Sequence, residues 1–349
     1  MSTKPDRNPT MLDVARAAGV STMTVSYFYS RPDRVSPRTQ QAVRAAAERL
    51  GYTGPNPTAL ALRRRRNGAL GVVFGEHLTY AFEDPQACRF LAGIADVCRT
   101  EYVTLSLIPS TGDGDDARRV RAAACDGYIV WTTVPGDEAL ATAVATGKPV
   151  AIQGGPRIKG ARTVSINDRA SAVAVARTSF VNARRPAVVS FPFDRDRRAR
   201  LEYDPDASEI EFPVTRERLL GIYDACRELR IAQPPVAVVA RNEASSARGL
   251  VADLFDEAEP DAVVAMSDQL AFAVLDEADR RGLHVPQQLA VAAWDDGPEA
   301  HERGLTTIAQ SLFEQGRQCA RIALSLRQSS VAADWTLMTR HSTAAGTER

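Results

Sequence analysis

The stretch Thr10-Met-Leu-Asp-Val-Ala-Arg-Ala-Ala-Gly-Val-Ser21 predicts one short helix that ends in a turn. Thr10 can accept hydrogen bonds from the first free backbone N–H groups of this helix, and Asp13 lies where the helix dipole favours an anion. Gly19 suits the left-handed conformation that often follows a helix end. We therefore expect a helix that begins just after Thr10 and ends just before Gly19.

Two further helices are expected downstream of this stretch. Ser21 is suited to cap a second helix from Thr22 to about Tyr29, and a third helix should follow Ser36-Pro37 and stop at Gly51. The residues expected to face inward from the three helices are Leu12, Val14, Ala15, Val25, Val43, Ala46, Ala47 and Leu50. Two short helices joined by a three-residue turn that contains glycine are typical of the helix-turn-helix. A small helical bundle with another purpose has the same pattern.

The charge of the chain is divided unevenly. The 349 residues carry 43 basic and 43 acidic side chains, so the formal net charge is zero. Residues 1–66 hold 12 basic and 4 acidic side chains, which gives +8, so the remaining residues carry −8. A nucleic-acid partner is therefore compatible with the neutral total if it binds the basic segment.

A second basic feature follows the three predicted helices. Residues 56–66 read Asn56-Pro-Thr-Ala-Leu-Ala-Leu-Arg-Arg-Arg-Arg66. Four consecutive arginines cannot lie in a core, and a solvated linker is the plain interpretation. A helix that begins at Pro57 and pairs leucine with cationic side chains also has what a minor-groove wedge needs.

Together these motifs resemble the headpiece of the lactose-repressor (LacI/GalR) family over roughly the first seventy residues. The resemblance implies a helix-turn-helix headpiece at 1–52 and a hinge helix and linker at 53–68. It implies that Thr22, Met23 and Tyr27 read bases in the major groove. It further implies that Ser21, Ser26 and Ser36 contact phosphates. The hinge helix would contain Asn56, Ala59 and Leu62, with Leu62 as the wedge.

Two residues depart from the family pattern. Tyr27 stands where most members carry arginine, and it cannot make the bidentate pair that arginine makes with guanine. Leu60 replaces an arginine that is usual in the hinge, so one phosphate contact is expected to be missing. The operator sequence therefore cannot be transferred from relatives.

From Gly68 onward, short apolar runs alternate with helical patterns. The expected strands are 70–74, 103–108, 127–131, 149–152 and 163–166, and then 187–191, 236–240, 262–266 and 289–294. The expected helices are about 85–100, 115–125 and 138–146, and then 170–181, 216–229, 245–257 and 269–281. Such alternation predicts parallel sheets, and two series predict an α/β core of two doubly wound lobes over residues 69–349. Ligands bind beyond the carboxyl ends of such strands, so a cleft between the lobes is the expected site.

Motifs for catalysis, metals or membranes are lacking in the sequence. The glycine-rich and lysine-containing segments have the wrong spacing for dinucleotide or P-loop binding, and the four histidines have no ligand spacing. The five scattered cysteines form no C-x-x-C pair, which favours reduced thiols and a cytoplasmic location. We therefore expect no enzymatic activity, no cofactor, no metal site and no membrane partner.

The family resemblance continues more loosely to about Gln310. It implies a fold like that of periplasmic sugar-binding proteins, with effector contacts from Arg218, Ser267 and Asp295. Phe82 and Tyr80, just after the first strand, could offer an apolar face for a ring-shaped ligand, although core packing explains Phe82 equally well. A structural ion pair is the alternative role for Arg218 and Asp295. Gln153 replaces an aspartate found in many relatives, and the arginine-rich loop 194–205 is expected to be solvated or to act as a lid.

The sequence thus predicts a transcriptional regulator, more specifically a repressor. Its expected partners are a palindromic double-stranded DNA operator, a sugar-like or nucleoside-like effector, and a second copy of the chain in a homodimer. Tetramers in the family that the chain resembles use a C-terminal leucine helix, so the short polar tail at 342–349 implies a dimer rather than a tetramer. The alternative is a soluble small-molecule binding protein, or an enzyme, with a vestigial DNA-binding head.

Overall fold

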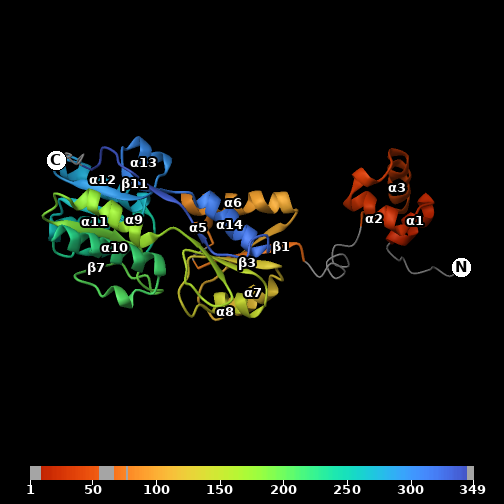
Figure 1. Cartoon of the computed structure of the whole chain (residues 1–349), viewed down its shortest axis with the longest axis horizontal. Helices are drawn as coiled ribbons and strands as arrows, with labels where there is room; N and C mark the ends of the chain where they lie inside the picture. Colours follow the sequence, from red (N-terminus) through yellow and green to blue (C-terminus); the bar gives the residue numbers. More distant parts are fainter. Residues whose placement is uncertain (1–8, 55–66, 76–77, 344–349) are drawn as a thin grey trace. The chain divides into compact units, whose positions relative to one another are not determined.

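The computed structural model describes residues 9–54, 67–75 and 78–343. The chain forms two compact units, Met1–Asn67 and Gly68–Arg349 (Figure 1). We call the first unit the head and the second unit the body. Within the described ranges, no helix is both long enough and apolar enough to cross a lipid bilayer.

The head has the predicted helix-turn-helix order. Its elements are α1 Met11–Ala18, α2 Thr22–Ser30, the 3-10 helix η1 Pro32–Arg34, and α3 Pro37–Leu50. Thr10 and Asp13 cap α1 reciprocally, because each side chain accepts a hydrogen bond from the other residue's backbone N–H. Gly19 ends the helix at φ 67°, a left-handed conformation that glycine adopts without steric cost. The predicted start and end of the first helix are confirmed.

Two predicted core positions of the head are wrong. Leu12 is 45% exposed and Leu50 is 36% exposed. The inward stripe of α1 is instead shifted by one position, because residues at i, i+3, i+4 and i+7 share one helix face. The residues that form the core of the head, or pack against it from α1, are Met11, Val14, Ala15, Ala18, Val25, Val43, Ala46 and Ala47.

The body contains two doubly wound lobes, as predicted. Lobe 1 has a six-stranded, fully parallel sheet in the order β12-β5-β4-β3-β1-β2. Its strands are β1 Ala69–Phe74, β2 Thr104–Pro109, β3 Gly127–Trp131, β4 Val150–Gln153, β5 Arg162–Ser165 and β12 Val331–Ala332. Its helices are α5 Tyr80–Glu83, α6 Pro85–Glu101, α7 Asp116–Ala122, α8 Glu138–Ala145 and α14 Leu312–Ala323. Val72 and Val73 of β1 belong to different cores, so helices cover both faces of this sheet.

Lobe 2 has a seven-stranded sheet in the order β13-β11-β10-β9-β6-β8-β7, parallel except for its two edge strands. Its strands are β6 Pro186–Ser190, β7 Arg200–Glu202, β8 Val236–Val238, β9 Ala262–Ala265, β10 Ala290–Asp295, β11 Thr306–Gln310 and β13 Trp335–Met338. Its helices are α9 Asp168–Phe180, η2 Ala207–Glu209, α10 Pro213–Leu229, α11 Ala244–Ala258, α12 Asp268–Arg281 and α13 Pro298–Glu302.

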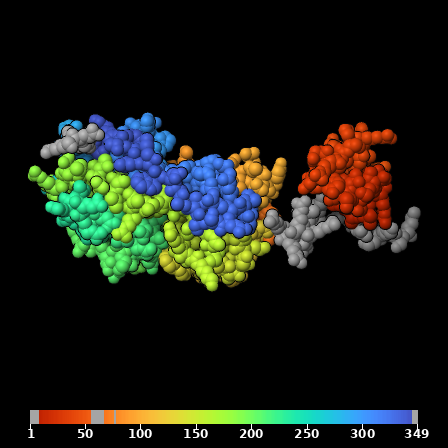
Figure 2. Space-filling view, viewed as in Figure 1, coloured from red at the N-terminus to blue at the C-terminus, as the bar shows by residue number. Residues whose placement is uncertain are grey.

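The chain passes between the lobes three times, after β5, after β11 and after β12. The last two passages return α14 and β12 to lobe 1 and then deliver β13 to lobe 2. Figure 2 shows the result, since the blue C-terminal part of the body lies against both lobes. The C-terminal tail is not wholly a surface segment, because Ser342 and Thr343 are buried. Both lobes are therefore built from segments that are far apart in sequence.

Candidate functional site

The exposed face of α2 carries the residues predicted to read bases. Val25 faces the core, whereas Met23 is 64% exposed and Tyr27, one turn further along, is 38% exposed. Thr22 is also exposed, and Ser26 is half-buried. The predicted base-reading side chains therefore share one accessible face of the second helix.

Two of the three serines predicted to contact phosphates, Ser21 and Ser36, cap the starts of helices, whereas Ser26 lies within α2. Ser21 Oγ accepts a hydrogen bond from the Thr24 backbone at 3.0 Å, and Ser36 Oγ accepts one from the Thr39 backbone at 3.3 Å. Each of these two serines thus lies among backbone N–H groups that favour anions. The predicted hinge residues Asn56, Ala59 and Leu62 lie outside the described residues.

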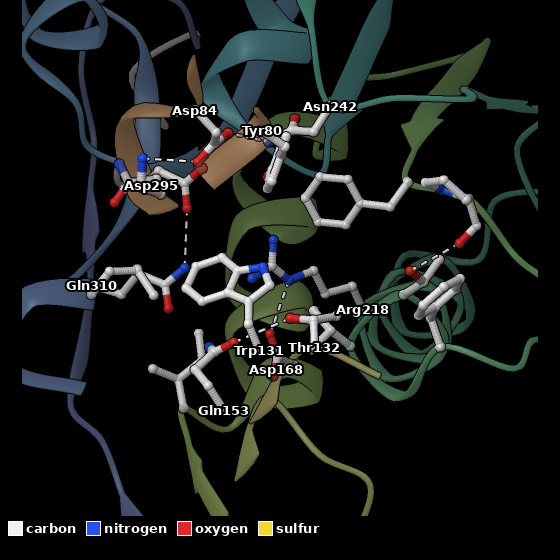
Figure 3. Close-up of a pocket in the computed structure, with 18 of the residues that line it drawn as sticks. Tyr80, Asp84, Trp131, Thr132, Gln153, Asp168, Arg218, Asn242, Asp295 and Gln310 are labelled. Atoms are coloured by element: carbon white, nitrogen blue, oxygen red, sulfur yellow. Dashed lines mark hydrogen bonds and ion pairs between the residues drawn. The ribbon is translucent and has the colours of Figure 1, made fainter. Parts of the chain in front are cut away.

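The body contains a cleft whose walls come from both lobes. Lobe 1 contributes residues from α5 and α6 and from the ends of β3 and β4 (Figure 3). Lobe 2 contributes loops that follow its strands and the N-terminal parts of α9 and α10, which carry Asp168 and Arg218. The lining residues with polar or aromatic side chains are Tyr80, Asp84, Gln86, Trp131, Thr132, Gln153, Asp168, Phe191, Arg197, Phe212, Thr215, Arg218, Asn242, Asp295 and Gln310. This cleft lies beyond the carboxyl ends of the strands, where the topology predicts ligand binding.

Arg218 lines the cleft and also forms a buried ion pair. Its Nε lies 2.9 Å from Asp168 Oδ1, and its Nη1 donates a hydrogen bond of 2.6 Å to the Met266 carbonyl. The pKa of Asp168 is raised, because the effect of burial outweighs the opposing effect of the neighbouring guanidinium. The sequence favoured a ligand contact over an ion pair, but the ion pair is present, and its partner is Asp168 rather than Asp295. Asp168 therefore compensates the charge of Arg218.

Asp295 ends a line of hydrogen-bonded side chains that begins at Thr132 on the other side of the cleft. Figure 3 labels the two ends of this line, Thr132 with Gln153 and Gln310 with Asp295. Thr132 donates to Gln153 at 3.2 Å, and Gln153 donates to Gln315 at 3.2 Å. Gln315 donates to Gln310 at 3.1 Å, and Gln310 donates to Asp295 Oδ1 at 3.0 Å. The line connects lobe 1 to lobe 2, and a ligand that displaces any member changes the partners of its neighbours.

A second polar connection joins the lobes through Asn242. Asn242 Nδ2 donates to Asp84 Oδ2 at 3.0 Å, and Ser267 Oγ donates to Asn242 Oδ1 at 2.5 Å. Ser267 is fully buried and does not line the cleft, so the structure places it behind Asn242. Asp84 also caps α6, and burial raises its pKa.

The aromatic wall of the cleft differs from the predicted one. Phe82 is 63% exposed and is not among the lining residues, whereas Tyr80 is. Trp131 contributes a further ring, held from behind by Phe74 and Phe90 with ring centroids at 5.9 and 4.6 Å. Trp131 is the last residue of its strand, and the rule that sites follow strand ends could have found it.

Two carboxylates of lobe 2 are strongly affected by burial. Burial, with the neighbouring carboxylate of Asp295, raises the pKa of Asp268 to about 8. Burial also raises the pKa of Asp295, although Arg218 opposes the change. Asp268 Oδ2 lies 2.8 Å from the Gly297 backbone nitrogen and Oδ1 lies 2.8 Å from Thr307 Oγ1. Asp268 is therefore a structural neighbour of the cleft, whereas Asp295 lines it.

Models of known protein families match both the head and the body. A model of bacterial regulatory proteins of the lacI family matches residues 10–56, and a model of periplasmic binding protein-like domains matches residues 206–343. An HTH-type transcriptional regulator of Mycobacterium tuberculosis is 33% identical over 341 residues, which cover 95% of this chain and 94% of the relative. The HTH-type transcriptional regulator IpsA of Corynebacterium glutamicum is 33% identical over 320 residues, 86% of each chain.

The fold is matched over the same length. The crystal structure of a LacI-family transcriptional regulator from Corynebacterium glutamicum superimposes with a TM-score of 0.72 and 25% identity, over 97% of this chain and 99% of that one. The helix-turn-helix head, the two-lobed body and the similarity over nearly the full length all support the same assignment. The chain belongs to the LacI family of bacterial transcriptional regulators.

Proposed function

We propose that this regulator is a repressor that binds a palindromic operator as a homodimer and that a small molecule in the cleft changes its operator affinity. The observation that carries the proposal is the cleft itself, in which aromatic rings and hydrogen-bonding side chains from both lobes face one space. A ligand that contacts both lobes must favour one relative position of the lobes over another. Such differential binding is what couples a ligand site to a distant DNA site.

The ligand is proposed to be a neutral ring with several hydroxyl or amide groups, such as a sugar or a nucleoside. Asp295 offers acceptor oxygens, Asn242 and Gln153 offer both donors and acceptors, and Trp131 and Tyr80 offer faces for a ring. The charge of Arg218 is compensated by Asp168, so this guanidinium does not call for an anionic ligand. Arg218 and Asp295 remain proposed ligand contacts.

In the head, Thr22, Met23 and Tyr27 are proposed to read bases. The exposed methionine and tyrosine suit contacts with thymine methyl groups, and the tyrosine hydroxyl can make one hydrogen bond to a base edge. Ser21, Ser26 and Ser36 are proposed to contact phosphates. Asn56, Ala59 and Leu62 are proposed to form the hinge at the centre of the operator, with Leu62 as the wedge.

The decisive experiment is selection of operators by the full chain from a random duplex pool, followed by fluorescence anisotropy. We expect a palindromic consensus and salt-sensitive, sequence-selective binding. Tyr27→Ala should change the preferred base at one symmetric pair of positions, whereas Tyr203→Ala, at an exposed tyrosine of the body, should leave the consensus unchanged. If the full chain selects no consensus, the repressor proposal is wrong, and the protein is a binding module with a vestigial head.

Screening sugars and nucleosides by thermal shift tests the cleft separately. A ligand that raises the melting temperature should also change operator affinity in the anisotropy assay. A ligand that stabilises the body and leaves operator affinity unchanged would contradict the proposed coupling.

A further inference from the structure

The loop between β6 and β7 forms a stiff turn on lobe 2, which we call the 193–197 turn. The backbone N–H of Arg197 donates to the carbonyl and to Oδ1 of Asp194, at 3.3 and 3.0 Å. Arg200 holds the other carboxylate oxygen of Asp194 at 3.3 Å and lies over the buried ring of Phe193. Arg197 has φ 50°, a left-handed conformation that a non-glycine residue keeps only when its surroundings hold it there.

Two arginines of this turn reach across the cleft to lobe 1. The guanidinium of Arg195 forms an ion pair with Asp137 Oδ2, and Arg197 Nη2 donates to the Gly75 carbonyl at 3.4 Å. Arg197 also lies 5.4 Å over the ring of Phe212 and lines the ligand cleft. The turn is thus anchored on one lobe and bound to the other.

Asp137 is positioned to receive this contact. It is the N-cap of α8, and its Oδ1 accepts a hydrogen bond of 2.7 Å from the Leu140 backbone. This bond fixes the carboxylate and leaves Oδ2 directed to the partner lobe. The side chain of Asp137 is 5% exposed, whereas that of Arg195 is 43% exposed. A carboxylate so poorly hydrated needs its cation, so the closed position of the turn is favoured.

The contact lies at the mouth of the cleft. A surface hollow next to the ligand cavity is lined by Asp137 and Gly75 from lobe 1 and by Arg195 and Arg197 from lobe 2. Tyr80, Thr132, Arg197 and Phe212 line this hollow and the ligand cavity together. A molecule that passes from the hollow to the cavity therefore passes the 193–197 turn.

We propose that the 193–197 turn is a clasp that holds the two lobes closed before any ligand is bound, through the Arg195–Asp137 ion pair and the Arg197–Gly75 hydrogen bond. Opening the cleft separates Arg195 from Asp137, so both ligand arrival and ligand departure require the clasp to release. The consequence for ligand exchange rests on the proposed function, whereas the clasp itself consists of contacts between protein groups and can be tested without a ligand.

Acrylamide quenching of Trp131 fluorescence in the ligand-free full chain tests the clasp. Trp131 lines the cleft, Trp294 is fully buried, and Trp335→Phe removes the remaining tryptophan. In the Trp335→Phe protein, Arg195→Ala should make quenching of Trp131 more efficient. Loss of an ion pair with one exposed partner should lower the ratio of closed to open molecules by about two- to fivefold. The increase should disappear when Trp131→Phe is added.

Matched variants separate a clasp from a general loosening of the fold. Asp137→Asn keeps an acceptor for the Leu140 N–H and removes the charge, so it should raise quenching as Arg195→Ala does, and the double variant should add little more. Arg198→Ala removes an arginine of the same loop that is 78% exposed and pairs with Asp196, and it should have no effect. Added salt should raise quenching in the parent but not in Asp137→Asn. Equal quenching in the parent, Arg195→Ala and Asp137→Asn, at unchanged melting temperature, would overturn the clasp without touching the ligand or operator proposals.

Discussion

The raised pKa values of buried carboxylates predict that the stability of this regulator depends on pH. Asp268 is almost fully buried, and its pKa is raised from 3.8 to about 8. Between these values the native state holds a proton at Asp268 that the unfolded state has released. Stability should therefore fall as pH rises through this interval, by at most about 1.4 kcal/mol per pH unit.

Asp268→Asn should reduce this pH dependence, although Asp295, whose pKa burial also raises, still contributes to it. The carboxamide can still accept from the Gly297 N–H and donate to Thr307 Oγ1, so the packing is preserved. Denaturant unfolding between pH 5 and pH 8 should give a flatter stability profile for the variant, with its largest gain over the parent near pH 8. Parallel profiles for the two proteins would show that Asp268 is ionised in the native state.

Asp295 carries the prediction for the ligand site. With the best ligand from the thermal-shift screen, Asp295→Asn should weaken binding by about ten- to a hundredfold, since a hydrogen bond to a charged group contributes about 1.5–3 kcal/mol. Phe82→Ala is the matched control, because Phe82 follows the same first strand as Tyr80 and does not line the cleft. Calorimetric titration should find parental affinity for Phe82→Ala. Loss of affinity in the Phe82 variant instead would place the ligand outside the cleft.

The sequence predicted some of the site residues and missed others for a physical reason. Arg218 and Asp295 line the cleft, but Asp168, Asn242 and Gln310 were not predicted to do so. These three become site residues through partners that are distant in sequence, such as Asp84 for Asn242. Apolar periodicity reports which side chains are buried locally, and it contains no information about which polar side chains meet across two lobes.

At the scale of elements, most central strands were predictable, but the central strand β11 and the chain crossings were not. The nine predicted strands are present with their ends shifted by no more than about two residues, because buried parallel strands are apolar and β-branched runs. Strands β7, β11, β12 and β13 and helices α5, α13 and α14 were not predicted. Strand β12 has two residues, and its place beside β5 is set by tertiary packing rather than by its own sequence.

The packing of α6 against α14 depends on glycine. A Cβ at Gly316 would lie 2.2 Å from the Phe90 carbonyl oxygen, so the helix backbones could not stay in contact. Gly316→Ala should therefore destabilise lobe 1, by about 1–3 kcal/mol. Gly249→Ala is the matched control in α11, where an added Cβ meets no atom within 4 Å. It should stabilise the protein by about 0.5–1 kcal/mol, because alanine is the better helix former. Melting temperatures that move in the same direction for both variants would contradict this account.

For the whole molecule, the neutral net charge conceals a division of function. The +8 of residues 1–66 belongs to the unit with the helix-turn-helix, and the −8 of the remainder belongs to the unit with the cleft. The positions of the charged residues along the sequence reveal this division, because the charge of a segment can be summed without knowledge of the fold. The predicted hinge residues lie outside the described residues, so their role in DNA binding stays a prediction.

The charge division predicts where the salt dependence of operator binding originates. Each phosphate contact releases counterions and contributes about 0.9 to the slope of log affinity against log salt. Arg38 is exposed in the first turn of α3, next to the proposed phosphate contact at Ser36. Arg38→Gln should lower the slope by about 1 and weaken all sequences alike, because a phosphate contact carries no base information. Arg198→Gln makes the same charge change in the acidic unit and should leave the slope unchanged, since like charge keeps that unit away from phosphates. Anisotropy titrations at four or more salt concentrations measure both slopes, and an equal reduction in the two variants would mean that DNA contacts extend to the body.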